Sequence, residues 1–548
     1  MGIAVMSLAS LLSAYSSTTA SKPYTTYTFS ALLGGLIILA FFILIKILKT
    51  SLKLQKRQRG FPLPPGPASW PIIGNLPQML TSRPTFRWLH ALLEEMGTNI
   101  GCVRIGNVHI IPVTCPKIGL EFLKEQDAIF ASRPKTMASR IVSRNYLTIA
   151  FPPNGEQWKK MRKMMMSEIL SSSRHKWMHD KRMEEADNLV KYVYHQSIGG
   201  SVDVRSATRH YAANVIRKMV FNTRHFGQAT LDGSPGTAEE EHVAAIFLSL
   251  KYLYSFCISD YYPFLEGLDI DGHEKYIKEA CKMMNNLHDP IIDERIEQWQ
   301  EDDGLKEPQD LLDVMISLKD PNGNPLLSSE EIKAQTAELM IATIDNPSNA
   351  VEWALAEMIN QPELLKKAVE ELDKVVGRER LVQESDMSQL NFVKACAREA
   401  FRLHPIAPFT PPHMAMQDAT VAGYFIPKGS HVILSRMGLG RNPDVWEEPL
   451  KFKPERHITS DRSEVVLIEK NLRFISFSAG RRGCVAATLG TSMTVMLLAR
   501  LLQGFEWSPP AGVEKVELKE SVEDLFMAKP LVARAEPRLL IHLYQAAI

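Results

Sequence analysis

The loop from Phe477 to Ala486 constrains this chain more than any other stretch; it reads Phe-Ser-Ala-Gly-Arg-Arg-Gly-Cys-Val-Ala. Gly480 and Gly483 permit backbone conformations that other residues avoid, which predicts a tight loop. The apolar run after it, 485–502, predicts a buried helix. Cys484 therefore stands just before a helix N-terminus, where the helix dipole and unpaired N–H groups favour a thiolate and lower the pKa.

A cysteine beside a glycine is most often a buried structural residue. Four positions of this loop, however, fit the pattern Phe-x-x-Gly-x-Arg-x-Cys-x-Gly: Phe477, Gly480, Arg482 and Cys484. The segment thus resembles the haem-binding loop of the cytochrome P-450 superfamily. The resemblance implies that Cys484 is the proximal iron ligand, that Phe477 shields its sulfur and that Arg482 contacts a haem propionate. Ala486 replaces the last family glycine, which changes helix packing and leaves ligation intact.

Composition narrows the class of protein. The chain has 548 residues and a formal net charge of +1, which gives no electrostatic reason to expect a nucleic-acid partner. Length alone leaves the number of domains open. The six cysteines include no Cys-x-x-Cys pair, which argues against a zinc ribbon or a disulfide scaffold and favours a reducing compartment.

The N-terminal region predicts a membrane anchor at 29–47. From Phe29 to Ile45 every residue except Ser30 is apolar or glycine, and a basic flank follows. The positive-inside rule keeps that flank in the cytosol and makes residues 1–28 a lumenal tail. A cleaved signal peptide is the alternative, but its small-residue cleavage pattern is missing.

A basic and proline-rich hinge is predicted at 48–75, ahead of a haem-thiolate catalytic domain at 76–548. Its prolines fix φ and stiffen the connection; an SH3-type ligand is the alternative interpretation. Microsomal members of the resembled superfamily carry the same hinge. The resemblance implies a single-pass protein of the endoplasmic reticulum membrane, whose catalytic domain faces the cytosol.

Helical spacing of apolar residues dominates the catalytic domain. Helices are predicted at 83–96, from 156 onward, and at 183–195, 239–254, 272–298 and 330–359. The segment 102–113, which turns at Gly106-Asn107, predicts a β-hairpin. Together with the resemblance, this pattern predicts a mainly α protein with small β-sheets, the cytochrome P-450 fold.

A charged motif supports the resemblance. Glu399 and Arg402 share one face of a helix that is predicted to open with a capping box at 386–389. Alone, such a pair is usually a surface contact of small energy. The resemblance implies instead that both join Arg456, within Pro-Glu-Arg-His, in a buried network that fixes the cysteine loop.

Further positions match ligand-binding residues of the superfamily. Trp158 and Arg162 lie one helical turn apart, so both can face one ligand, and the resemblance implies that they hold a haem propionate. His413 stands where relatives place a second propionate-binding residue. An exposed loop histidine without that role is the alternative.

The long helix departs from the common pattern. It is predicted to begin with a capping box at 328–331. Most members of the superfamily carry a proton-delivering threonine where this chain has Asn346. Pro347 follows, removes an N–H and clashes with the Thr343 carbonyl, so the helix is predicted to open beside the iron. Asp345 and Asn346, with water, are the candidates for proton delivery; a neutral kink is the alternative.

Asn-Pro at this position and the motifs above also resemble one plant branch, the amino-acid N-hydroxylases that form aldoximes. The resemblance implies haem b, O2, electrons from NADPH through a cytochrome P-450 reductase, and contact with the lipid bilayer. It implies two N-hydroxylations, dehydration and decarboxylation of an L-amino acid. Apolar pocket walls favour phenylalanine; the residues implied are Leu339, Ala342, Phe409, Phe526 and Met527. A carbon-hydroxylating or oxygen-independent haem-thiolate enzyme, and a non-enzymatic haem sensor or carrier, are the alternatives.

Overall fold

The computed structural model describes residues 34–35, 60–227, 234–301, 306–459 and 463–545. The chain divides into two units, Met1–Pro62 and Leu63–Ile548. The predicted lumenal tail and anchor lie outside the described residues, apart from Gly34 and Gly35. The larger unit contains every predicted site residue.

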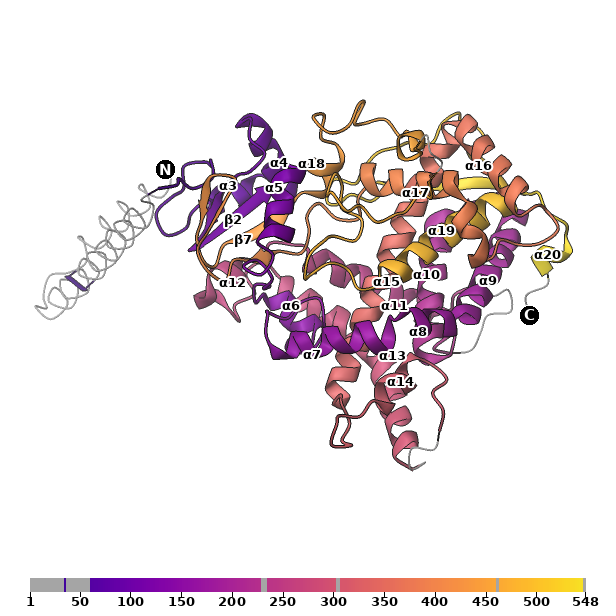
Figure 1. The fold of residues 1–548 in the computed structure, drawn as a ribbon, viewed down its shortest axis with the longest axis horizontal. Helices are drawn as coiled ribbons and strands as arrows, with labels where there is room; N and C mark the ends of the chain where they lie inside the picture. The colour runs from indigo at the N-terminus through magenta and orange to yellow at the C-terminus, as the bar shows by residue number, and fades with distance from the viewer. Residues whose placement is uncertain (1–33, 36–59, 228–233, 302–305, 460–462, 546–548) are drawn as a thin grey trace, which may run out of the picture. The chain divides into compact units, whose positions relative to one another are not determined.

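Helices make up most of the larger unit (Figure 1). They are α3 (Leu76–Thr81), α4 (Thr85–Glu95), α5 (Pro116–Leu120), α6 (Met137–Val142), α7 (Glu156–Met164), α8 (Ser172–Trp177), α9 (His179–Ile198), α10 (Val204–Phe221), α11 (Thr237–Leu253), α12 (Ile258–Tyr261), α13 (His273–Glu301), α14 (Leu311–Ser317), α15 (Ser329–Ile359), α16 (Pro362–Val375), α17 (Asn391–Leu403), α18 (Arg436–Gly440), α19 (Ala487–Gly504) and α20 (His542–Gln545). Each helix predicted from apolar spacing is present, with shifted ends.

The described strands form three small sheets. The first has the order β1 (Val103–Ile105), β2 (Val108–Val113), β7 (His431–Leu434) and β4 (His413–Met414); the second has the order β3 (Val202–Asp203), β9 (Val532–Pro537) and β8 (Phe505–Ser508); the third pairs β5 (Ala419–Val421) with β6 (Tyr424–Ile426). The predicted hairpin is β1–β2, antiparallel with Val103 opposite Ile110. The prediction of a mainly α fold with small sheets is therefore confirmed.

Helix α15 forms the centre of the helical core. It packs against α10, α13, α17 and α19, and most of its residues are buried. Its predicted capping box is present: the Glu331 amide donates to Ser328 Oγ at 3.2 Å and the Ser328 amide donates to a Glu331 carboxylate oxygen at 2.8 Å. The helix begins where the sequence indicates because these two bonds satisfy its first free N–H groups.

The prediction that α15 opens at Pro347 is wrong. Helical backbone continues across this residue to Ile359. Side chains bond the carbonyls of the same turns: Asn346 Nδ2 donates to the Ala342 carbonyl at 3.0 Å, and Ser348 Oγ donates to the Ile344 carbonyl at 2.6 Å. Packing against α10, α13, α17 and α19 holds the helix, and the missing N–H of Pro347 costs it one bond, the one to the Thr343 carbonyl.

The predicted capping box at 386–389 does not open α17. Asp386 instead completes a box with Gln383, which begins the 3-10 turn Glu384–Gln389. The start of α17 is capped from a neighbouring helix: the Glu371 carboxylate of α16 accepts hydrogen bonds from the amides of Phe392 and Val393. Local spacing misplaces the cap because its acceptor is distant in sequence.

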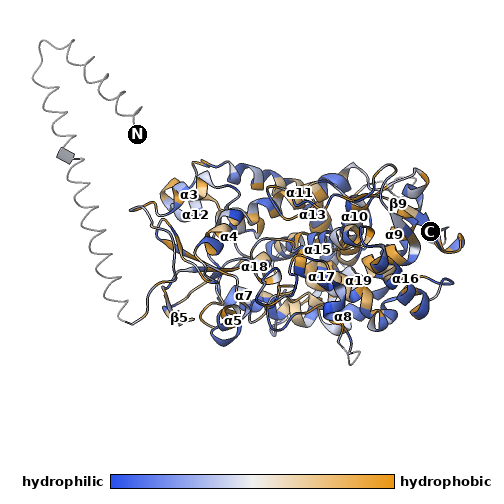
Figure 2. Ribbon diagram, turned by 90° about the horizontal axis from the view of Figure 1, so that it is seen from above, coloured by the Kyte–Doolittle hydropathy of each residue, from blue (hydrophilic) through white to orange (hydrophobic). Residues whose placement is uncertain are grey.

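Amphipathic helices surround this core, as Figure 2 shows by the hydrophilic residues along the outside of α8 and α16. Within the described ranges, one helical stretch, Thr237–Tyr261, is long and apolar enough to cross a membrane. It contains α11, which packs against α13 and α15. Core helices of folded domains commonly have such a composition.

Candidate active site: the cysteine loop and its pocket

The loop 477–486 folds back on itself ahead of α19. The Cys484 amide donates to the Phe477 carbonyl at 2.8 Å, and the Gly483 amide donates to the Gly480 carbonyl at 3.0 Å. Gly480 has φ +71°, and a Cβ there would lie 1.9 Å from the Leu123 carbonyl oxygen. Only glycine meets both conditions, which explains the fixed geometry of the loop.

The prediction of a lowered Cys484 pKa is wrong for the protein alone. The residue has accessible surface, yet desolvation by the surrounding protein atoms raises the pKa of its thiol. The Ala486 amide and the cations of Arg436 and Arg162 oppose that rise. Helix α19 begins only at Ala487, so the thiol receives one backbone amide, that of Ala486, and not the several free N–H groups expected at a helix N-terminus. A bound metal cation would deprotonate this thiol outright.

Beside this loop, Arg133, Arg162 and Arg482 form a cationic cluster with Trp158, in which Arg162 is half-buried and the other two arginines are buried. The Arg482 guanidinium lies 4.1 Å from the centre of the Trp158 ring and donates to the Ala131 carbonyl at 2.6 Å. Arg162 donates to the Gly483 carbonyl at 3.3 Å. Burial, Arg133 and Arg162 lower the pKa of Arg482 to about 8.

This cluster lacks a counter-charge in the described ranges. None of its three arginines has a carboxylate within 4.0 Å there, and Trp158 Nε1 is buried without a hydrogen-bond partner. Unpaired buried donors and cations are costly, so the cluster is suited to an anionic ligand with several acceptor oxygens.

His413 lies at the edge of this cluster, on β4. One ring nitrogen, Nδ1, lies 2.9 Å from the Phe130 carbonyl and donates to it. In the neutral ring Nε2 is then an acceptor, so His413 contacts a carboxylate through Nε2 only when it is protonated. Burial and Arg133 hold its pKa well below the ordinary value. A closely bound anion would raise the pKa of His413 again.

Glu399, Arg402 and Arg456 meet in one buried network. Arg402 forms a bidentate salt bridge with Glu399: Nε donates at 2.8 Å and Nη2 donates at 2.6 Å to its carboxylate oxygens. Arg456 Nε reaches the same carboxylate at 3.1 Å. Arg402 also donates to the Gly440, Pro449 and Lys451 carbonyls, which ties α17 to the segment before the cysteine loop.

His457 completes this network. Its Nε2 lies 2.7 Å from Glu399 Oε2, and its Nδ1 accepts from Arg398 at 3.3 Å. Against the effect of burial, Arg402 and His457 hold the pKa of Glu399 at about 2. The motif Pro-Glu-Arg-His contains this histidine, but the sequence does not predict its role.

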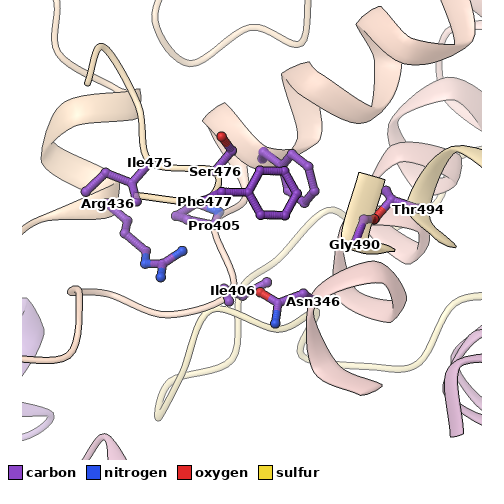
Figure 3. Close-up of a pocket in the computed structure, with 10 residues that line it drawn as sticks. Asn346, Pro405, Ile406, Arg436, Ile475, Ser476, Phe477, Gly490 and Thr494 are labelled. Carbon is purple, nitrogen blue, oxygen red and sulfur yellow. The ribbon is translucent and has the colours of Figure 1, made fainter. Parts of the chain in front are cut away.

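A pocket lies between α15, α19 and the start of the cysteine loop (Figure 3). Its walls include Phe477 and Gly490 on one side and Asn346 on the other. The Arg436 guanidinium points into it (Figure 3). The structure thus places the loop that carries the cysteine and the Asn-Pro departure on one cavity.

The other predicted α15 residues differ in their surroundings. Thr343 Oγ1 donates to the Leu339 carbonyl at 2.7 Å, so its hydroxyl is used within the helix. Asp345 is 2% exposed and its Oδ1 has no hydrogen-bond partner. Burial raises the pKa of Asp345 to about 7, although Arg209 and Arg436 lower it.

The residues predicted as pocket walls do not share one surface. Ala342 is exposed and Phe526 half-buried, with its ring 5.8 Å from that of Phe247. Leu339 and Met527 are buried. Phe409 packs in the core near the four-stranded sheet, stacked 5.3 Å from His90. None of the five lines the pocket of Figure 3.

A family model described as Cytochrome P450 matches residues 64–533 of this chain. The chain therefore belongs to the cytochrome P450 family. It is 60% identical over 488 residues to a tyrosine N-monooxygenase of Sorghum bicolor, covering 88% of this chain and 87% of the relative. It is 58% identical to a phenylalanine N-monooxygenase of Prunus mume (89% and 93% covered) and 54% identical to tryptophan N-monooxygenase 1 of Arabidopsis thaliana (96% and 97% covered). These relatives confirm the resemblance to the plant amino-acid N-hydroxylase branch.

The family implies a haem, dioxygen and reductase-supplied electrons from NADPH. The residues present fit a haem. Cys484 would ligate its iron, and Trp158, Arg162 and Arg482 would face its propionates, whose charge answers the unpaired cations. When bound through a thiolate, a haem of this kind activates dioxygen. Sequence patterns missed Arg133 and Arg436 in these surroundings, because no spacing rule joins them to the loop.

Proposed function

We propose that this chain converts an L-α-amino acid to its aldoxime through two successive N-hydroxylations, followed by loss of water and carbon dioxide. Each hydroxylation takes one O2 and two electrons from NADPH through a reductase; one oxygen atom enters the N–H bond and the other leaves as water. The observation that carries the proposal is the 54–60% identity to amino acid N-monooxygenases over nearly the whole chain.

The residues around α15 support a role in holding the substrate nitrogen. Asn346 uses Nδ2 on the Ala342 carbonyl, which leaves Oδ1 as an acceptor at the pocket. Pro347 has no N–H, so the Thr343 carbonyl lacks its helical donor. Asn346 Oδ1 and the Thr343 carbonyl oxygen are thus two free acceptors on the same helix. Such acceptors suit an amine that must be oriented for N-oxidation. Asp345, whose pKa is about 7, can hold or release a proton at neutral pH.

Phenylalanine is the favoured substrate in this proposal. A phenylalanine N-monooxygenase is among the relatives of high identity, at 58%. Tyrosine, tryptophan and branched aliphatic amino acids follow, because relatives that act on each are of similar identity.

We also propose the membrane arrangement that the sequence indicates: an anchor at 29–47 and a hinge at 48–75 in front of the catalytic domain, with residues 1–28 in the lumen of the endoplasmic reticulum. The basic flank after Ile45 supports this orientation. A reductase on the cytosolic side would then reach the cysteine-loop face.

The test uses microsomes that contain the full chain and a cytochrome P450 reductase, supplied with NADPH and each of the twenty amino acids. Mass spectrometry of the products is expected to show an aldoxime from phenylalanine and no product without NADPH. A carbon-hydroxylated product, or turnover without O2, would overturn the proposed function in favour of another haem-thiolate reaction.

A further inference from the structure

Arg436 is a buried cation without a partner in the part of the chain that the structure describes. The residue is 9% exposed, and its Nε is buried without a hydrogen-bond partner. No described carboxylate lies within 4.0 Å of its guanidinium. Burial lowers its pKa, and Tyr254, Asp345 and Cys484 oppose that shift through their charges without contacting the guanidinium.

Several of the other buried arginines in the described ranges are paired with carboxylates, whereas Arg133, Arg217 and Arg482 are not. Arg402 contacts Glu399, Arg182 contacts Glu384 and Arg398 contacts Glu469 through charged hydrogen bonds. Such pairing is the rule for guanidinium groups removed from water. Arg436, which lines the pocket, can therefore pair with an anionic ligand that enters it.

The backbone holds Arg436 rigidly at the pocket. It begins α18 directly after the sheet strand β7, and its amide donates to the Pro408 carbonyl at 2.8 Å. Ser435 caps the same short helix by accepting from the Gly438 amide at 2.7 Å. The side chain is thus directed from a fixed point toward Asn346 across the pocket (Figure 3).

We propose that Arg436 binds the carboxylate of the amino-acid substrate, while Asn346 faces its amine; this assignment rests on the proposed function. A guanidinium matches a carboxylate through two parallel N–H···O bonds, which fixes orientation as well as affinity. A haem propionate has the same chemistry and is the other source of the anion. The substrate is the better candidate, because a propionate site already stands on α7 and the cysteine loop, around Trp158.

The test compares two ligands on the haem-loaded full chain: the amino acid that is turned over fastest, and the amine that lacks its carboxylate. Dissociation constants come from the Soret shift on titration. In Arg436→Gln the constant for the amino acid is expected to rise about 10- to 100-fold, as for loss of a charge-assisted pair, and that for the amine to stay unchanged. Arg436→Lys is expected to recover part of the loss.

Arg174→Gln, a guanidinium stacked on Trp177 away from the pocket, is the matched control and is expected to leave both constants unchanged. Equal weakening of both ligands in Arg436→Gln, or no weakening of either, overturns the proposal. A fall in haem content with unchanged discrimination in the loaded fraction also overturns it and assigns the cation to a propionate. Failure of the wild-type chain to make any aldoxime would count against the proposed function and not against Arg436, whose discrimination is measured by binding.

Discussion

The network around Glu399 and the pocket around Asn346 are both buried and polar, but their hydrogen bonding differs. Glu399 is fully buried and accepts from Arg402, Arg456, His457 and a backbone amide. At the pocket, Arg436 Nε and, on the adjoining helix, Asp345 Oδ1 are buried without partners. A satisfied network serves the fold, whereas a buried polar group without a partner requires an explanation, and a bound ligand is one such explanation.

The largest expected effect comes from replacing Cys484. Cys484→Ser replaces a soft thiolate ligand, so the reduced carbon-monoxide complex is expected to lose the thiolate-type absorption and product formation to stop. Cys115→Ser, a half-buried cysteine on another segment, is the control and is expected to keep both. Thiolate-type absorption in the Cys484→Ser variant would refute the ligand assignment.

Breaking the satisfied network should cost stability. Glu399→Gln leaves two arginines without their carboxylate, at roughly 3 to 5 kcal/mol. Urea unfolding followed by loss of haem absorbance measures this. Because the folded pKa of Glu399, about 2, is below its ordinary 4.5, its contribution is complete above pH 4.5 and is lost as pH falls toward 2. A variant as stable as the wild type at pH 7 would contradict a structural role.

The unsatisfied acid should behave in the opposite way. The folded pKa of Asp345, about 7, is above its ordinary 3.8, so folded protein keeps a proton that unfolded chain loses, and stability falls as pH rises through that window. Asp345→Asn removes this term. Its unfolding free energy relative to wild type is expected to rise between pH 4 and 7, by up to about 4 kcal/mol, and then to level off. A pH-independent difference would contradict the burial of an unpaired carboxyl.

Restoring the common family pattern on α15 should affect chemistry and not folding. In Asn346→Thr with Pro347→Thr, the Thr343 carbonyl regains its N–H donor and the amide acceptor is lost. Aldoxime formation is expected to fall about 10- to 100-fold, with haem content unchanged and NADPH consumption reduced less than product. Product formation at the parent rate, with the same coupling, would show that the pair is only a tolerated proline.

The smallest effect is expected from the N-terminal unit. A chain that lacks residues 1–60 should still incorporate haem, because every residue that would contact it lies in the larger unit, Leu63–Ile548. Haem content and sedimentation with membranes are the measurements. Loss of haem incorporation in mild detergent would show that the N-terminal segment supports the catalytic domain.

The sequence by itself determined the features that depend on local patterns. The Phe477–Ala486 loop, the hairpin at 102–113 and the capping box at Ser328 were predictable, because neighbouring residues satisfy their geometry. Family motifs predicted that Phe477 and Arg482 accompany Cys484 and that Glu399, Arg402 and Arg456 form one group. The contacts within these groups could be seen only in the folded structure.

Only the tertiary structure decided the features that depend on distant partners. Glu371 caps α17 from another helix, packing keeps α15 helical across Pro347, and enclosure outweighs the local amide in setting the Cys484 pKa. No sequence motif points to Arg436. Its proposed function depends on the lack of a contacting carboxylate and on a pocket whose walls come from segments between Asn346 and Thr494. Burial and long-range contacts, which no local spacing encodes, separate these residues from the ones that the sequence predicted.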